Sequence, residues 1–181
     1  SAKGGINDAL VRLLGFNSDE IIEKSKINSF EQAGIGRIID LNEKVLMPGV
    51  IDVHTHMREP GITIKEDFGT GSRACARGGI TTFYDMPNTV PTTTTAAALK
   101  DKKNKAYEKS IVNFGFHFGG SRNDNIEEIK KVISEKEGNT VKIFMNVTTG
   151  EMLIENDEIL KKIFQNSNLV LVHAENEMID K

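Results

Sequence analysis

The sequence has little of several features that mark particular protein classes. Its single cysteine, Cys75, cannot form an internal disulfide, which is typical of a protein from a reducing compartment. No apolar run approaches the roughly 20 residues that a membrane-spanning helix needs. No positively charged and then apolar leader opens the chain. These absences predict a cytoplasmic protein that does not associate with membranes.

The chain also lacks an excess of charge of one sign. It has 23 basic and 26 acidic residues, which gives a formal net charge of −3. Nucleic-acid binders carry a basic stripe or patch, and none is visible here. The one basic cluster, Lys100 to Lys105, is interpreted as the solvated face of a helix. We therefore expect a small-molecule substrate and no nucleic-acid partner.

Strand-like and helix-like segments alternate from about residue 45 onward. Short β-branched runs predict strands, and apolar residues at helical spacing predict helices between them. The predicted strands are 50–56, 80–86, 111–118, 141–145 and 169–173, and the predicted helices are 66–77, 96–109, 125–137 and 157–165.

This alternation predicts an α/β fold with a parallel sheet and right-handed crossovers. A doubly wound sheet and a (β/α)8 barrel of the TIM type both satisfy it. Because a full barrel takes about 250 residues, a barrel here would contain only about the first five β/α units. Residues 45–181 would form this part of the barrel. Residues 1–44 would form an amino-terminal segment, with helices at 8–14 and 20–26 and a strand at 36–41 that enters the barrel.

Two histidines stand two residues apart on the first predicted strand. Because side chains alternate along a strand, His54 and His56 are expected on the same face. Barrel enzymes place their active sites at the carboxyl ends of the strands. Paired imidazoles there suit a transition metal. Asp52 is expected on the same face, either orienting a histidine or as a structural hydrogen-bonding residue.

Two more polar residues lie in or beside apolar strands. His173 ends the fifth predicted strand, at the same rim as the histidine pair, and is interpreted as a metal ligand. Lys142 lies inside the fourth, where an unpaired ammonium is expensive to bury. It is either a desolvated, nucleophilic amine or a lysine that reaches a carboxylate or water. His117 has no motif partner and is interpreted as a core or rim histidine. Glu175 is expected either to orient a ligand or to face solvent.

Three segments together resemble the signature of the dihydroorotases. They are LMPGVIDVHTHMREPG at 46–61, KEDF at 65–68 followed by GGITT at 78–82, and DMPNTVP at 85–91. The third is the most discriminating, because hydrolases of allantoin or hydantoins share the first motif but usually lack the Pro-Asn-Thr run. The resemblance covers about residues 36–181, and it favours the barrel over the doubly wound sheet.

The resemblance implies a set of site residues. His54 and His56 would hold one of two divalent metal ions, with zinc the expected element. Lys142 would be carbamylated and bridge the two ions, and His173 would bind the second. Some family members carry an aspartate in place of this lysine. Arg58 and Asn88 would bind the substrate carboxylate, although Arg58 could instead form a surface ion pair with Glu59 or Asp67.

The activity that the resemblance implies is the reversible hydrolysis of dihydroorotate to N-carbamoylaspartate, a step of de novo pyrimidine biosynthesis. The family's proton-shuttling aspartate follows the eighth strand and a further histidine ligand follows the sixth. Both lie beyond residue 181, so we expect the 181-residue chain alone to be inactive. Alternatives are an allantoinase or dihydropyrimidinase, and a non-catalytic scaffold for a transcarbamoylase. A homo-oligomer is also expected.

Overall fold

The computed structural model describes residues 47–138 and 140–175 in full, and the backbone of four short strands nearer the amino terminus. The chain forms two compact units, Ser1–Pro48 and Gly49–Lys181. The four short strands of the first unit pair antiparallel two by two: β1 (Ser18–Glu20) with β4 (Ile38–Ile39), and β2 (Glu23–Lys24) with β3 (Gly34–Ile35).

These strands correct the prediction for the amino-terminal segment. The helix expected at 20–26 is wrong at Glu20 and at Glu23–Lys24, which are strand residues. Glutamate and lysine favour helices only weakly, and strand pairing overrides that preference. Of the strand expected at 36–41, the described residues Ile38–Ile39 form β4, which pairs with β1. The helix expected at 8–14 lies outside the described residues.

The second unit alternates strands and helices. Its strands are β5 (Val50–Thr55), β6 (Ile80–Asp85), β7 (Asn113–Phe116), β8 (Phe118–Gly119), β9 (Thr140–Phe144) and β10 (Leu169–His173). Its helices are α2 (Phe68–Arg77), α3 (Ala96–Lys109), α4 (Ile126–Ser134) and α5 (Asp157–Gln165), with a short 3-10 helix, η1 (Gly150–Met152).

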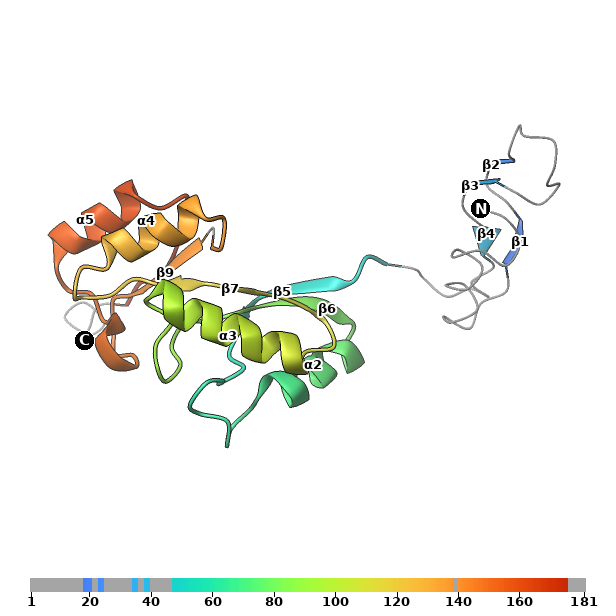
Figure 1. Cartoon of the computed structure of the whole chain (residues 1–181), viewed down its shortest axis with the longest axis horizontal. Coiled ribbons are helices and arrows are strands. Elements are labelled where there is room, and N and C mark those ends of the chain that lie inside the picture. The colour runs from blue at the N-terminus through green and yellow to red at the C-terminus, as the bar shows by residue number, and fades with distance from the viewer. Residues whose placement is uncertain are drawn as a thin grey trace. The chain divides into compact units, whose positions relative to one another are not determined.

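All strand pairs of the second unit are parallel, in the orders β5-β6-β7 and β8-β9-β10. A single residue, His117, separates β7 from β8, where one strand was predicted. In Figure 1, α2 and α3 lie side by side along β5–β7, and α4 lies beside α5 at the other end of the unit.

Local capping fixes where the helices begin. Asp67 precedes α2 and accepts a hydrogen bond from the Thr70 amide at 2.7 Å, as the first half of a capping box. The hydroxyl of Thr95 caps α3 by accepting from the Ala98 amide at 3.1 Å. Asn156 caps α5 in the same way. Each cap satisfies an amide that has no partner within its helix.

The core of the second unit lies between the strands and the helices. It contains stacked phenylalanines of the first strands and helix, and aliphatic residues from β9, α4 and α5: Phe68, Phe83, Phe116, Ile129, Val132, Val141, Ile143 and Ile163. Among the described residues, no helix combines the length and the apolar character that crossing a membrane requires.

Candidate metal centre

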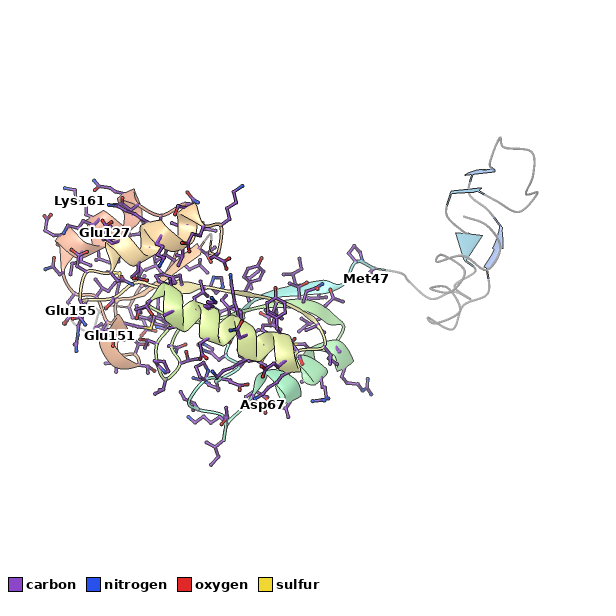
Figure 2. The ribbon with its side chains drawn as sticks, viewed as in Figure 1. Met47, Asp67, Glu127, Glu151, Glu155 and Lys161 are labelled. Atoms are coloured by element: carbon purple, nitrogen blue, oxygen red, sulfur yellow. The ribbon has the colours of Figure 1, made fainter. Side chains whose placement is uncertain are left out.

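The two histidines of β5 lie side by side. Their ring centroids are 5.4 Å apart, with His54 at the end of the strand and His56 just beyond it. The segments that follow the strands gather on one side of the unit. Figure 2 shows Asp67, which follows β5, and Glu151, which follows β9, on the lower side, whereas Glu127 and Lys161 lie on the helices above.

The end of β5 is irregular in a way that the sequence did not reveal. Asp52 pairs with Phe83 and Thr55 with Asp85, so three steps along β5 match two steps along β6. One extra residue is therefore accommodated between Asp52 and Thr55, as in a β-bulge. The Asp52 carboxylate accepts a hydrogen bond from the His54 amide at 3.0 Å. Of the two roles considered for Asp52, this is the structural one.

The surroundings of His56 favour its neutral form. Partial burial lowers the pKa of His56, the positive charge of Arg58 lowers it further, and the carboxylate of Asp85 opposes the shift. Neutral imidazole is the form that binds metal ions. The electrostatics of this side chain therefore suit a ligand.

The loop after β5 holds Arg58 in an unusual conformation. Arg58 has φ of 60°, in the left-handed region that costs a residue with a side chain about 1–2 kcal/mol. Glu59, buried at 4% exposure, accepts from the Phe68 amide at 3.1 Å and pairs with Lys109. Glu59 is thus engaged by a lysine and a helix start, so it is not the ion-pair partner considered for Arg58.

The loop after β6 is tied to the loop after β5. The Val90 amide donates to the Pro60 carbonyl at 3.1 Å. A β-carbon at Gly61 would lie 2.1 Å from the Val90 carbonyl oxygen, so only glycine fits between the loops. In the second loop, the side-chain oxygen of Asn88 is buried and has no hydrogen-bond partner among the described residues. An unsatisfied oxygen at this rim is suited to a ligand that brings a donor.

A buried ion pair lies beneath these loops. Asp85 and Lys102 are both fully buried, with the Lys102 Nζ 2.7 Å from Asp85 Oδ2. Asp85 Oδ1 accepts from the Met57 amide at 2.6 Å, and Lys102 also donates to the Met86 carbonyl at 2.7 Å. The pair therefore connects α3 and β6 to the residue that follows His56.

This pair corrects one prediction. Lys102 belongs to the cluster interpreted as a solvated helix face, and it is wholly buried. Burial lowers the pKa of Lys102, and the charge of Asp85 opposes that shift. A signal was present in the sequence, because Leu99, Lys102 and Ala106 share one face of the helix, and both neighbours are buried.

The other predicted ligands meet around one aromatic ring. The Lys142 Nζ lies 4.8 Å from the centre of the Phe144 ring, and the His173 ring stacks on the same ring at 5.9 Å. Lys142 is 3% exposed, and burial lowers the pKa of its amine. No carboxylate pairs with it among the described residues. His173 Nε2 lies 3.2 Å from Glu175 Oε1, so Glu175 orients this histidine.

His117 lies between the two groups and is a core histidine, 3% exposed. Its Nε2 lies 2.8 Å from the Val53 carbonyl oxygen, and its Nδ1 lies 2.7 Å from Thr140 Oγ1. Burial lowers the pKa of His117, and the hydrogen bond to the Val53 carbonyl opposes this shift.

The structure thus brings His54 next to His56, and Lys142 near His173. Within residues 47–138 and 140–175, no three histidine, cysteine or carboxylate side chains converge on one point as metal ligands do. The donor set nevertheless fits a metal. Two imidazoles are adjacent, one of them favoured in its neutral form, and a buried amine has no counter-charge.

The chain is similar in sequence to known proteins. Residues 45–181 match the sequence profile of the Amidohydrolase family. A curated dihydroorotase of Methanosphaera stadtmanae is 40% identical over 142 residues, which cover 78% of this chain and 32% of that protein. A curated allantoinase of Streptomyces avermitilis is 44% identical over 95 residues, or 52% of this chain and 21% of that protein. The chain spans about a third of the length of the curated dihydroorotase.

A solved structure supports the fold. The L-hydantoinase (dihydropyrimidinase) of Arthrobacter aurescens superposes with a TM-score of 0.65 at 36% identity, covering 74% of this chain and 30% of that one. This likeness confirms the predicted α/β fold of the TIM type.

Proposed function

The chain belongs to the Amidohydrolase family, and on this premise we propose that the protein is a dihydroorotase, which interconverts dihydroorotate and N-carbamoylaspartate. The observation that carries the proposal is the adjacent pair His54 and His56, with Arg58 two residues further on, in a chain that is 40% identical to a curated dihydroorotase over 142 residues. The imidazoles are donors for a metal, and the guanidinium is a partner for the substrate carboxylate.

The proposal includes the architecture and the metal ligands. The second unit would be the first five β/α units of a (β/α)8 barrel, with β7 and β8 as one interrupted strand. His54 and His56 would hold one divalent ion, His173 a second, and carbamylated Lys142 would bridge them. The bound ions, with zinc the expected element, would lower the pKa of a water and polarise the ring carbonyl.

The state of Lys142 supports this role. A neutral lysine amine adds to carbon dioxide, forming a nitrogen–carbon bond and releasing one proton, which leaves an anionic carbamate. Burial lowers the pKa of Lys142 and so raises the fraction of reactive amine. The carbamate would also give this buried position the negative charge that a cation requires.

Arg58 and Asn88 would orient the substrate. A guanidinium binds a planar carboxylate through two parallel hydrogen bonds. Arg58 lies near enough to His56 to lower its pKa, so a carboxylate held by Arg58 would place the ring beside the histidine pair. The side-chain N–H of Asn88 would donate to the same carboxylate, and its buried oxygen, which has no hydrogen-bond partner among the described residues, would accept from a substrate N–H.

The substrate test replaces Arg58 in the longest form of the protein that its reading frame encodes. We expect Arg58→Met to lower kcat/KM for dihydroorotate roughly 10- to 100-fold, the scale of a hydrogen bond to a charged group, mainly through KM. Lys65→Met, in the same loop and exposed, is the matched control and should change little. The parallel substrate is dihydrouracil, the same ring without the carboxylate.

The outcomes separate the candidate functions. An equal loss on both substrates would contradict the carboxylate role of Arg58. A wild-type enzyme that prefers dihydrouracil or hydantoins would instead be a dihydropyrimidinase. The structural similarity to the L-hydantoinase of Arthrobacter aurescens is the observation that favours this alternative. About two zinc ions per chain by elemental analysis fit an enzyme, and none would fit a scaffold for a transcarbamoylase. The homo-oligomer and the cytoplasmic location stay predictions.

A further inference from the structure

We infer that His117 is a positioning residue that fixes the distance between the two strands carrying the proposed ligands His54 and Lys142. The inference rests on the proposed function, because it concerns how that metal site is held. His117 stands at the break between β7 and β8, and its ring is bonded at both nitrogens to other strands.

The two hydrogen bonds define one tautomer. The Val53 carbonyl can only accept, so His117 Nε2 carries the proton and donates to it at 2.8 Å. Burial lowers the pKa of His117 and favours the neutral ring, in which Nδ1 is an acceptor and the Thr140 hydroxyl donates to it at 2.7 Å. The ring is therefore neutral and fully bonded. This leaves no nitrogen for a metal, so His117 acts through its neighbours.

Each bond ends beside a proposed ligand. Val53 directly precedes His54, within the irregular stretch of β5 where one residue is extra. Thr140 and Lys142 are two residues apart on β9, so their side chains leave the same face of the strand. The ring thus connects β5 to β9, which are not neighbours in the sheet.

The ring itself is held firmly. The His117 amide donates to the Asp85 carbonyl at 3.1 Å, and the Tyr84 ring lies 5.6 Å away. Only 3% of the residue is exposed, so water cannot replace the bonds that it makes. A rigid connection of this kind would keep β5 and β9 at one separation before a metal binds. Metal binding would then not have to supply the free energy that brings the two strands together.

Three variants test the inference in the longest encoded form of the protein. His117→Phe keeps a flat ring and removes both bonds. Thr140→Val keeps the side-chain shape and removes one. Ser72→Ala is the matched control, because Ser72 is fully buried and bonded to the Ile111 amide on the helical side of the sheet, at α2. The first measurement is zinc affinity and stoichiometry by competition with a chelating dye.

We expect both site variants to bind zinc roughly tenfold or more weakly, the scale seen when the groups that orient metal ligands are removed. Excess zinc should restore much of kcat, with KM for dihydroorotate unchanged. Ser72→Ala should lose stability but keep the zinc affinity. In the metal-free wild type, imidazole ¹⁵N shifts should show the Nε2–H tautomer, which Thr140→Val should disturb.

The outcomes distinguish this inference from the proposed function. If the wild type binds zinc and hydrolyses dihydroorotate while both site variants keep the wild-type affinity, only the role of His117 is overturned. If the wild type binds no zinc, the proposed function fails, and the role of His117 fails with it. Should His117→Phe not fold, Thr140→Val decides alone.

Discussion

The two halves of the second unit hold their proposed ligands by different means. The first half, β5–β7 with α2 and α3, carries His54 and His56 and contains two ion pairs: Asp85 with Lys102, both buried, and the buried Glu59 with the exposed Lys109. The second half, β8–β10 with α4 and α5, packs aliphatic residues. Its one buried lysine, Lys142, has no counter-charge among the described residues.

The difference indicates which half is ready for a metal. In the first half, ion pairs and backbone hydrogen bonds stabilise the loops around the histidines whether or not a metal ion is bound. The second half buries an amine whose surroundings disfavour its charged form. The second half avoids an unpaired buried charge only when the Lys142 amine is neutral, or when it is carbamylated and lies beside a metal ion. The two halves should therefore respond in opposite directions when their buried lysines are removed.

The largest effect is expected in the first half. Lys102→Met leaves Asp85 buried and unpaired, and should lower the free energy of unfolding by roughly 3–5 kcal/mol. Urea denaturation of the full chain measures it. Lys105→Met, which breaks the exposed pair with Asp101, is the control and should cost less than about 1 kcal/mol.

A second replacement sharpens this result. Adding Asp85→Asn to Lys102→Met removes the stranded charge while keeping an oxygen for the Met57 amide, and should recover part of the stability. If Lys102→Met were no more harmful than Lys105→Met, the first half would not depend on its buried charges.

In the second half the sign reverses. Lys142→Met should raise the free energy of unfolding of the metal-free chain by about 1–3 kcal/mol at neutral pH. The replacement removes the cost of burying an amine that has no hydrogen-bond partner among the described residues. Since folding lowers the pKa of Lys142, the unfolded chain binds this proton more readily. The wild type should thus gain stability as pH rises from the lowered pKa toward the ordinary value, and the variant should gain less.

Denaturation at several alkaline pH values measures this slope. Lys102 contributes a slope of the same sign in both proteins, so the difference between wild type and Lys142→Met isolates Lys142. Lys161→Met, on the exposed surface of α5 in Figure 2, is the control and should leave the slope unchanged. A destabilised Lys142→Met with an unchanged slope would mean that the amine has a stabilising partner.

The smallest expected effect on stability concerns the loop after β5, which contains Arg58. Arg58 has a positive φ, which glycine adopts freely and alanine does not. Arg58→Gly should therefore be more stable than Arg58→Ala by about 1 kcal/mol, while both lose activity on dihydroorotate. Thermal unfolding of the two variants gives the comparison, and equal stabilities would show that the loop changes its backbone when the side chain is removed.

The sequence predicted most of the regular structure of the second unit. The helices at 96–109 and 157–165 and the strand at 169–173 match residue for residue, and each of the two helices begins after a capping residue, Thr95 or Asn156. The helix at 20–26 was wrong at its described residues, Glu20 and Glu23–Lys24, because strand pairing overrides their weak preference for a helix.

The surroundings of the candidate site were less predictable. Spacing alone places His54 beside His56. The helix face that Lys102 shares with Leu99 and Ala106 indicates its burial, but its partner Asp85 lies 17 positions earlier, and no local pattern predicts that pairing. Equally, Phe144 joins Lys142 to His173 only because β9 and β10 pair in register, from Thr140 with Leu169 to Phe144 with His173. Whether these side chains bind metal stays a prediction.

The extra residue in β5 sets the phase of everything that follows it. The single step from Val50 to Ile51 matches two steps along β6, and the extra residue between Asp52 and Thr55 compensates for it, so that Thr55 pairs with Asp85 at the same offset as Val50 with Ile80. Deleting Val53 would therefore remove this compensation and shift His54 and His56 by one position against β6, which would turn the histidine pair toward the opposite surface. In a lineage of such proteins, substitutions along this strand can accumulate gradually, but a one-codon deletion would remove the site in a single event.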